Sequence, residues 1–305
     1  MKKRVLVFGS NGMLGAMVSK YLVARTDFEV AGTYHKNSLS ALTEIELANE
    51  YNFDASSMAV GHDLDGILRE FRPDYIVNCI GIINRYCNTG KSADVLRATQ
   101  INSVFPHFLS SITNGQNKNT RILQIATDCV YDGSDGFYTE DARQAALDVY
   151  GKSKSLGEVD ASNFLNIRCS IIGPELEHKT SLLEWCFSHA KGSEVNGYLH
   201  HYWNGVTTLQ FAQLCDKIFR EDLFSFYHEK FHTVHYVINQ PVNKFELVEL
   251  INEVFHLGLV VKPVSQPQPT INRTLASAFL QNDIQPMRNA IFELKKEMDY
   301  LNFYG

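Results

Sequence analysis

The stretch RVLVFGSNGMLG (residues 4–15) decides the fold class of this chain. Its β-branched and apolar start predicts a buried strand over Arg4–Phe8, and an amphipathic helix is predicted from Met13 to Ala24. Between them, glycines every third residue allow a tight turn, a close backbone approach to a pyrophosphate and close helix–strand packing. The alternative is a tight turn that binds nothing. The predicted dinucleotide contacts are Gly9, Asn11, Gly12, Met13, Leu14 and Gly15.

Short apolar segments alternate with helix-like segments through the first half of the chain. Further strands are predicted at 28–34, 51–54, 75–83, 121–127 and 164–172. Helices are predicted at 63–71 with Asp63 as its cap, at about 93–112 with a kink or break at Pro106, and at 148–160. This alternation predicts an α/β fold with a doubly wound parallel sheet and crossovers on both faces.

The pattern becomes less regular beyond Pro174. Helices are predicted at 181–190, 208–219 and 244–255, a strand at 234–239 and a loop at 263–270. We therefore expect a dinucleotide-binding domain over residues 1–170 and a smaller substrate-binding lobe over residues 171–305, some segments of which return to the first domain.

Composition narrows the partners and the compartment. The 305 residues are 45% hydrophobic and 20% charged, with a net charge of −6, which gives no reason to expect nucleic acid or an anionic membrane as partner. Six widely spaced cysteines without a C-x-x-C pair favour reduced thiols over a disulfide framework or a zinc site. The apolar run at the start is too short for a signal peptide, and no segment reaches the length of a membrane span. We expect a soluble, cytoplasmic protein.

The run GTYHKN (32–37) follows the second predicted strand. An acidic residue here would hydrogen-bond the ribose 2′-hydroxyl and disfavour a 2′-phosphate. The chain has His35 and Lys36 instead, which predicts NADPH over NADH as the cofactor. The alternative is that both residues are solvated loop residues.

Tyr150 and Lys154 lie four residues apart in DVYGKSKSLGE (148–158), so they share one face of the predicted helix. A neighbouring ammonium favours the phenolate and lowers the pKa of a tyrosine. Together with a dinucleotide site, the pair indicates proton transfer to a carbonyl oxygen coupled to hydride transfer. The alternative is an exposed helix on which the tyrosine ring packs against lysine methylenes.

At this point the sequence resembles the extended short-chain dehydrogenase/reductases, which have a Rossmann sheet. Within them it is most similar to the dTDP-4-dehydrorhamnose reductases and related sugar-nucleotide 4-ketoreductases. The matching stretches cover nearly the whole chain: FGSNGMLG (8–15), VNCIGI (77–82), INSVFPHFL (101–109), ATDCVYDG (126–133), YTEDA (138–142), DVYGKSKSLGE (148–158), IRCSIIG (167–173) and GVTTLQFA (205–212).

The resemblance implies a catalytic trio of Thr127, Tyr150 and Lys154. Tyr150 would protonate the oxygen of a 4-keto sugar as hydride reaches C4, and Thr127 would hydrogen-bond the same oxygen. Lys154 would lower the pKa of Tyr150 and bind the nicotinamide ribose. The further cofactor contacts that it implies are Asp54 and Ala55 near the adenine, Cys79, Ile80 and Gly81 along the ribose, and Asn102. Asp54 could equally be an ordinary carboxylate at a strand end.

The implied substrate contacts are Asp128, Tyr131 and Trp203. An aromatic ring such as that of Trp203 can stack on a base or on a sugar face, and packing in the core is the alternative. We expect no metal, because His200 and His201 lack acidic or cysteine partners nearby and are interpreted as surface histidines.

Three positions depart from the family pattern. Ala126 stands where relatives commonly have serine, which leaves Thr127 as the hydroxyl donor. Cys129 stands where the related 4,6-dehydratases have a glutamate, and this favours a reductase over a dehydratase. Ile171 replaces a tryptophan that many rhamnose-forming relatives carry near the sugar, so the hexose stays open.

The expected function is the NADPH-dependent reduction of a nucleotide-linked 4-keto-6-deoxyhexose, with dTDP or UDP as the nucleotide, in the synthesis of a deoxysugar for surface polysaccharide. NADH is the alternative cofactor. The alternative functions are a sugar-nucleotide epimerase with retained NAD and a non-catalytic, NADP-binding regulatory subunit of another enzyme. A homodimer is expected from the resemblance alone.

Overall fold

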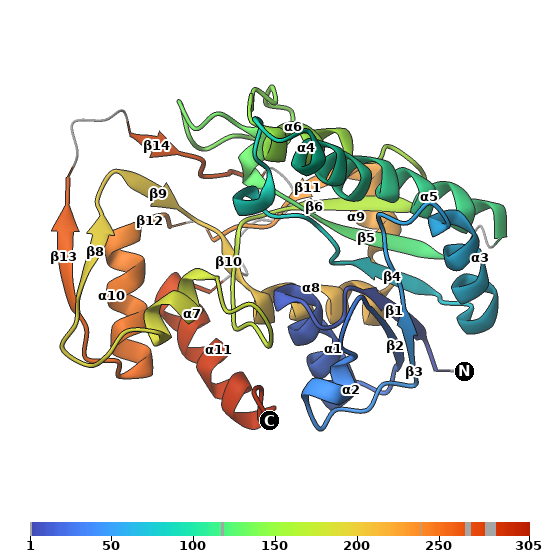
Figure 1. Cartoon of the computed structure of the whole chain (residues 1–305), viewed down its shortest axis with the longest axis horizontal. Helices are drawn as coiled ribbons and strands as arrows, with labels where there is room; N and C mark the ends of the chain where they lie inside the picture. Colours follow the sequence, from blue (N-terminus) through green and yellow to red (C-terminus); the bar gives the residue numbers. More distant parts are fainter. Residues whose placement is uncertain (1, 117–118, 239, 266–269, 278–284) are drawn as a thin grey trace.

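A computed structural model describes residues 2–116, 119–238, 240–265, 270–277 and 285–305 of the chain. Its main feature is a seven-stranded parallel sheet (Figure 1). The strands of this sheet are β1 (Arg4–Phe8), β2 (Glu29–Tyr34), β3 (Asn49–Asn52), β4 (Tyr75–Asn78), β5 (Arg121–Ala126), β6 (Phe164–Arg168) and β11 (Thr233–His235). Their spatial order is β11-β6-β5-β4-β1-β2-β3. The chain thus builds outward from β1 to β3 and then returns to place β4 on the other side of β1. A crevice for a ligand is expected at this switch, beyond the carboxyl ends of β1 and β4.

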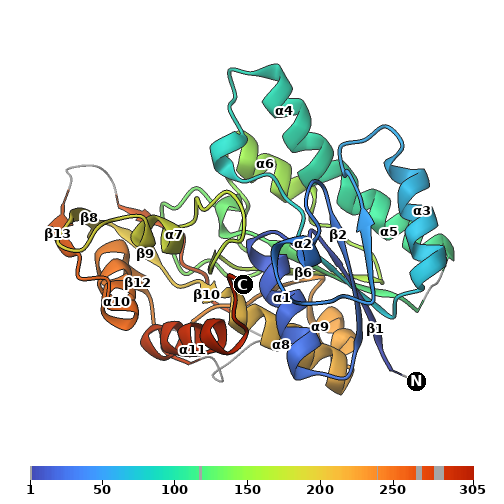
Figure 2. The ribbon, with the colours of Figure 1, turned by 60° about the horizontal axis from the view of Figure 1, so that its bottom comes forward.

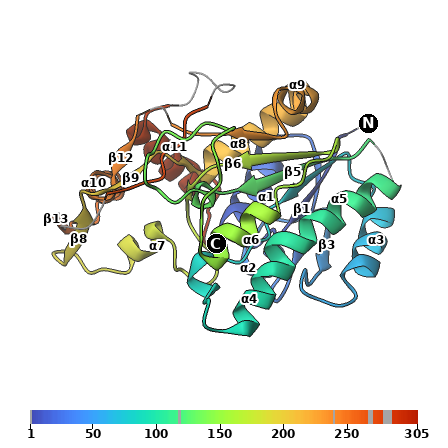
Figure 3. The same cartoon turned by 90° about the horizontal axis from the view of Figure 1, so that it is seen from above.

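Helices cover both faces of the sheet. One face carries α1 (Met13–Arg25), α8 (Thr208–Glu221) and α9 (Phe224–Lys230). The other carries α3 (Val60–Phe71), α4 (Ser92–Ala98), the π-helical turn η2 (Thr99–Val104), α5 (Phe105–Gln116) and α6 (Val149–Leu156), which run along the sheet in Figure 3.

The two faces follow from the alternation of side chains along each strand. On β1, Val5 and Val7 pack into the core that contains α1 and α8. Leu6 and Phe8 point the other way, into the core that contains α3 and α5. A strand buried on both sides explains why residues 5–8 are apolar without interruption.

The remaining elements form a smaller lobe beside the sheet (Figure 2). Its members are α7 (Leu182–Phe187), β8 (Glu194–Tyr198), β9 (His201–Trp203), β12 (Val242–Asn243), α10 (Lys244–Phe255), β13 (Val260–Val264), β14 (Ile271–Asn272) and α11 (Met287–Tyr300). A pair of short strands, β7 (Ile171–Ile172) and β10 (Val206–Thr207), lies where the chain passes between the two parts. The other short elements are α2 (Leu39–Leu42), η1 (Asn84–Tyr86) and η3 (Asp128–Val130).

The predicted α/β fold with a doubly wound parallel sheet is confirmed, and β1 and α10 have the predicted bounds. The predicted cap at Asp63 is wrong, because α3 begins at Val60 and Asp63 lies in its first turn. The predicted strand 164–172 ends at Arg168, and Ile171–Ile172 pairs with β10 in a separate sheet. The predicted strand 75–83 likewise stops at Asn78, since the chain turns there into the crevice.

Pro106 does not break the helical segment at its own position. The irregularity is the π-helical turn at Thr99–Val104, which runs directly into α5 just before Pro106. A proline inside a helix crowds the carbonyl four residues earlier, and that carbonyl lies within the π-helical turn. In the second half, β11 covers Thr233–His235, and residue 239 of the predicted strand lies outside the described residues. Of the predicted loop 263–270, residues 263 and 264 belong to β13 and 266–269 lie outside the described residues.

Candidate active site

The glycine-rich turn is shaped by close backbone contacts. Gly9 has a φ of 75°, which favours glycine. A Cβ on Gly15 would lie 2.0 Å from the Gly9 carbonyl oxygen, so only glycine lets the start of α1 approach the turn this closely. The Ser10 amide and hydroxyl both donate to the Thr33 carbonyl, at 2.9 and 3.0 Å, which fastens the turn to β2.

The start of α1 lies where the crevice is expected, and no side chain of the described residues caps it. Its N-cap is Gly12, and the first amides of a helix have no acceptor within the helix. Such amides bind anions, including the pyrophosphate of a dinucleotide. The turn after β4 packs against the glycine-rich turn. The Cys79 amide donates to the Phe8 carbonyl at 3.0 Å, and a Cβ on Gly9 would lie 3.1 Å from Ile80 Cγ1. The two turns therefore border the same expected crevice. The residues present therefore suit a dinucleotide.

The residues predicted to lie near the adenosine come together at the end of β2. His35 and Lys36 are exposed, and His35 Nε2 lies 3.7 Å from Asp54 Oδ2. Asp54 accepts hydrogen bonds from the Ser56 amide and hydroxyl, at 2.8 and 2.7 Å. Although partial burial acts against it, these bonds and His35 lower the pKa of Asp54. Ala55 packs its side chain into the core, which leaves only its backbone to a ligand.

Asn102 holds the turn after β4 in place. Its Oδ1 accepts from the Ile82 amide at 2.8 Å, and its Nδ2 donates to the Ile82 carbonyl and to Ser153 Oγ, both at 3.0 Å. Both amide hydrogens of the buried side chain are therefore used within the protein. In this structure Asn102 positions Gly81 and its neighbours, and its predicted contact with the cofactor stays a prediction.

The three residues of the predicted trio meet at the carboxyl end of β5. Thr127 directly follows β5, and Tyr150 and Lys154 lie on α6, whose N-cap Asp148 accepts from the Gly151 amide at 2.9 Å. A Cβ on Gly151 would lie 2.4 Å from the Cys129 carbonyl oxygen, so glycine is what allows α6 to pack directly on the chain after β5. Tyr150 lies close enough to Thr127 for that residue to lower the pKa of its phenol.

The expected effect of Lys154 on Tyr150 is not observed in this structure. Burial raises the pKa of Tyr150 above its ordinary value, and the influence of Thr127 only partly opposes this. Lys154 Nζ donates to the Ile125 carbonyl at 2.8 Å, and burial lowers the pKa of Lys154 to about 8. A Cβ on Gly81 would lie 3.8 Å from the same Nζ, which places the ammonium at the turn that borders the crevice.

Tyr131 is buried in the core of the protein. Its side chain is 0% exposed and stacks on Tyr138, with ring centroids 4.2 Å apart, and its hydroxyl accepts from Arg168 Nη1 at 2.6 Å. The chain bends at η3 and turns this ring into the core, and the substrate contact at Tyr131 stays a prediction. Trp203 is 6% exposed and belongs to the main core, in line with the alternative interpretation given for it.

Asp128 lies among cations that sequence reasoning missed. Burial raises the pKa of the Asp128 carboxyl, while Arg273 and Lys244 act in the opposite direction. Lys244 Nζ lies 5.0 Å from the Trp203 ring centroid, and burial lowers the pKa of Lys244 to about 8. Burial also lowers the pKa of His201. The neighbouring groups His200, Lys244 and Arg273 have smaller effects in the same direction.

No local signal could have placed Lys244 and Arg273 here, because each lies more than 100 residues beyond Thr127 in the sequence. The two histidines are half-buried rather than on the open surface. The part of the chain that the structure describes contains no group of three His, Cys, Asp or Glu side chains that could hold a metal ion.

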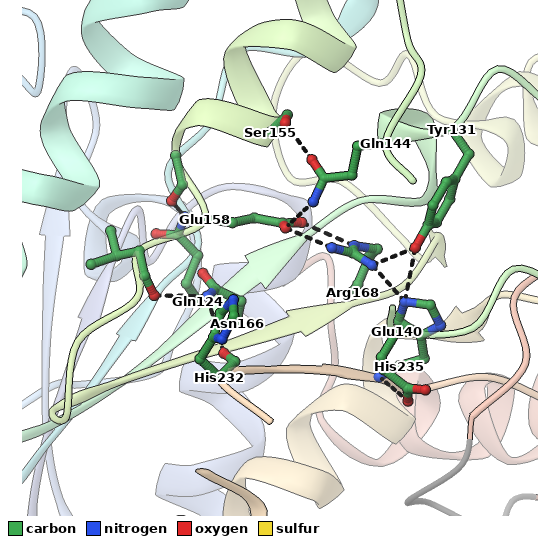
Figure 4. Close-up of polar contacts among 12 residues, drawn as sticks. Gln124, Tyr131, Glu140, Gln144, Ser155, Glu158, Asn166, Arg168, His232 and His235 are labelled. Atoms are coloured by element: carbon green, nitrogen blue, oxygen red, sulfur yellow. Dashed lines mark hydrogen bonds and ion pairs between the residues drawn. The ribbon is translucent and has the colours of Figure 1, made fainter. Parts of the chain in front are cut away.

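A buried polar network surrounds Arg168 (Figure 4). Arg168 on β6 forms two hydrogen bonds with Glu158, at 2.9 and 2.6 Å, and a third contact with His235 Nε2 at 2.7 Å. Burial, followed by Arg168, lowers the pKa of His235 to about 4, so the ring is neutral and its Nδ1 donates to the Ala276 carbonyl at 2.8 Å. The network ties η3, the end of α6, β6 and β11 to one another.

A family model described as "RmlD substrate binding domain" matches residues 2–285. The chain is 28% identical over 161 residues to the probable low-salt glycan biosynthesis reductase Agl14 of Haloferax volcanii, a match that covers 50% of this chain and 46% of that protein. It is 22% identical over 271 residues to methionine adenosyltransferase 2 subunit beta of Rattus norvegicus, covering 84% of this chain and 73% of that one. A solved structure of dTDP-4-dehydrorhamnose reductase from Bacillus anthracis in complex with NADP shares the fold, with a TM-score of 0.71, 17% identity, and coverage of 97% of this chain and 100% of that one.

Proposed function

The chain belongs to the family of the RmlD substrate binding domain, and on this premise we propose that it reduces the C4 ketone of a nucleotide-linked 4-keto-6-deoxyhexose with NADPH. NADH is the alternative cofactor. The observation that carries the proposal is the position of Thr127, Tyr150 and Lys154 at the sheet edge that also carries the glycine-rich turn. The NADP in the Bacillus anthracis structure supports the choice of cofactor.

The bound nicotinamide would supply a hydride to C4, and the protein would supply the proton. Tyr150 keeps its proton because burial raises its pKa, so it can donate to the ketone oxygen as negative charge develops there. Thr127 Oγ orients the same oxygen. The products are the C4 alcohol and the oxidised cofactor. Lys154, next to Gly81, would bind the ribose hydroxyls and hold the ring for transfer.

The cations beside Asp128 suit the diphosphate of a sugar nucleotide. The positive charges of Lys244 and Arg273 lower the pKa of Asp128 and also that of His201. These side chains therefore belong to one region of the protein. We place the diphosphate at this cluster and a sugar hydroxyl at the Asp128 carboxylate, one step along the chain from Thr127. The nucleotide, dTDP or UDP, and the configuration at C4 are left to experiment.

The assay uses the purified chain with dTDP-, UDP- and GDP-linked 4-keto-6-deoxy sugars and follows NADPH by its nicotinamide absorbance. Steady oxidation with one nucleotide class is expected. Tightly retained NAD without net NADPH consumption would indicate the sugar-nucleotide epimerase instead. NADPH binding without turnover of any sugar would favour a regulatory subunit, an alternative to which the resemblance to the rat beta subunit gives some weight.

We also propose that the chain forms a homodimer. Leu96, Phe108 and Leu156 are large exposed hydrophobic residues on α4, α5 and α6, which are neighbouring helices on one face. Burying such side chains between two copies removes apolar surface from water. Analytical ultracentrifugation should give twice the chain mass, and Phe108→Glu should shift the population toward the monomer.

A further inference from the structure

Glu177 links three segments that lie far apart in the sequence. Its Oε2 accepts from Asn11 Nδ2 at 2.7 Å, and its Oε1 accepts from Asn37 Nδ2 at 2.6 Å. Asn11 Nδ2 also donates to the Asn37 carbonyl at 2.9 Å. One carboxylate therefore connects the glycine-rich turn, the loop after β2 and the chain between β7 and α7, which runs beside the start of α1 in Figure 1.

The segment that carries Glu177 is held by contacts of its own. The Thr180 amide donates to Glu175 Oε2 at 2.6 Å, and Lys179 Nζ lies 4.9 Å from the centroid of the Tyr304 ring. His178 and Lys179 both have a positive φ, 63° and 47°, a backbone conformation that residues other than glycine adopt rarely. The chain therefore makes a sharp turn directly after Glu177. The carboxylate is thus presented to the two asparagines by a defined turn.

This position is where a dinucleotide-binding protein distinguishes its two cofactors. A carboxylate at the end of the second strand normally accepts from the ribose 2′-hydroxyl and repels a 2′-phosphate. In this chain His35 and Lys36 follow β2, and a carboxylate reaches the same loop from residue 177. Each carboxylate oxygen has about two acceptor sites, and an asparagine N–H occupies one on each, so Glu177 can still accept from a hydroxyl.

We propose that Glu177 is a specificity-determining residue for the cofactor, which accepts from a hydroxyl of the adenosine ribose and opposes a 2′-phosphate. The proposal rests on the proposed function and refines it. His35 and Lys36 would attract the 2′-phosphate of NADPH, and the negative charge of Glu177 would oppose that attraction. Preference between NADPH and NADH follows from that balance rather than from the loop after β2 alone.

The test is the ratio of the dissociation constants for NADPH and NADH, measured by the change in nicotinamide fluorescence on binding. Glu177→Gln keeps the size of the side chain and removes its charge. We expect this variant to bind NADPH roughly fivefold more tightly than the wild-type protein does, and NADH no more tightly. A fivefold change is typical of one interaction between partly exposed charges. Glu177→Ala should change the ratio in the same direction.

Glu175→Gln is the matched control, because Glu175 lies on the same segment but binds within it. This variant should leave the ratio unchanged. A ratio that stays constant in both Glu177 variants, with NADPH and NADH shifting by equal factors, would show that the residue only fastens the segment and would overturn the proposal. Failure of the wild-type protein to bind either cofactor would overturn the proposed function as well, so the two failures are distinguishable.

Discussion

At the scale of single residues, Tyr150 gains its role from the surroundings of its hydroxyl. Burial raises the pKa of the phenol, and Thr127 acts in the opposite direction. A protonated phenol is the form that carbonyl reduction requires, since the ketone oxygen must receive a proton.

Removing the Tyr150 hydroxyl should remove the proton donor. For Tyr150→Phe we expect kcat to fall roughly 10²–10⁴-fold, the usual range for loss of a general acid, while the dissociation constant of NADPH changes little. Steady-state kinetics and fluorescence titration measure the two quantities. Tyr86→Phe, at a tyrosine that is exposed, is the control and should keep normal turnover. A Tyr150→Phe enzyme of near-normal kcat would exclude the residue from the mechanism.

Lys154 should make the stability of the protein depend on alkaline pH. Burial lowers the pKa of its ammonium from 10.5 to about 8, so the unfolded chain binds the proton more tightly than the folded one. Stability rises with pH wherever the unfolded state binds more protons. The cost of burying the charge is thus present below pH 8 and is relieved between about 8 and 10.5.

Lys154→Met has no such group to titrate. The free energy of unfolding of the wild-type protein relative to Lys154→Met should therefore increase as the pH rises from 8 to 10.5. Urea denaturation at several pH values measures the difference. A difference that does not change across this range would contradict the lowered pKa of Lys154.

At the scale of elements, the catalytic geometry depends on how closely α6 approaches the chain after β5. The cap from Asp148 fixes where the helix begins, and Gly151 removes the side chain that would hold it away from Cys129. A preceding π-helical turn, η2, contacts α6 on its other side. The spacing of apolar residues does not reveal a single π-helical turn within a helix. The sequence therefore predicts one helix at about 93–112, with a kink or break at Pro106, and not the π-helical turn.

A methyl group at Gly151 should push α6 away from the crevice. The added Cβ would lie 2.4 Å from a backbone oxygen, so Gly151→Ala should lower the free energy of unfolding by about 1–3 kcal/mol and reduce kcat sharply. Gly66→Ala is the matched control, because Gly66 lies within α3 with open space around the new Cβ. That variant should gain about 0.5–1 kcal/mol from helix propensity and keep full activity. Equal behaviour of the two variants in denaturation and turnover would contradict the role given to Gly151.

At the scale of the whole molecule, the Arg168 network joins segments from both halves of the chain. Arg168 and Glu158 are buried, with side chains 2% and 5% exposed, and His235 on β11 contacts the same guanidinium. Despite its burial, the pair with Glu158 raises the pKa of Arg168, so the charge stays. The network fixes the strand order β11-β6-β5 behind the catalytic residues.

Neutralising Glu158 should leave a buried, unpaired guanidinium. For Glu158→Gln we expect a loss of about 3–5 kcal/mol in the free energy of unfolding, as is typical when one partner of a buried ion pair is removed. Denaturant titration monitored by circular dichroism measures it. Asp65→Asn removes one partner of an exposed pair with Arg69 and should have a much smaller effect, because solvent screens that pair. Comparable losses in the two variants would show that the Arg168 network is not buried as described.

The division of the chain into a domain over residues 1–170 and a lobe over residues 171–305 stays a prediction. The structure shows why a single boundary describes it incompletely. β11 joins the large sheet and α8 packs on α1, although both follow residue 171. Hydrophobic periodicity predicts that these elements exist, but it does not predict which part of the protein they pack against.

The sequence by itself determined the α/β class, the glycine-rich turn, and the chain positions of Thr127, Tyr150 and Lys154. The α/β class depends on the alternation of strands and helices, and the glycine-rich turn and the Tyr150–Lys154 pair depend on spacing within a few residues. The role of Thr127 was implied by the resemblance to a known family. Only the tertiary structure brought Glu177 to Asn37, placed Lys244 and Arg273 beside Asp128, and turned Tyr131 into the core. Such contacts join side chains that are distant in the sequence, and they are set by how the sheet, the helices and the smaller lobe pack, which no local pattern encodes.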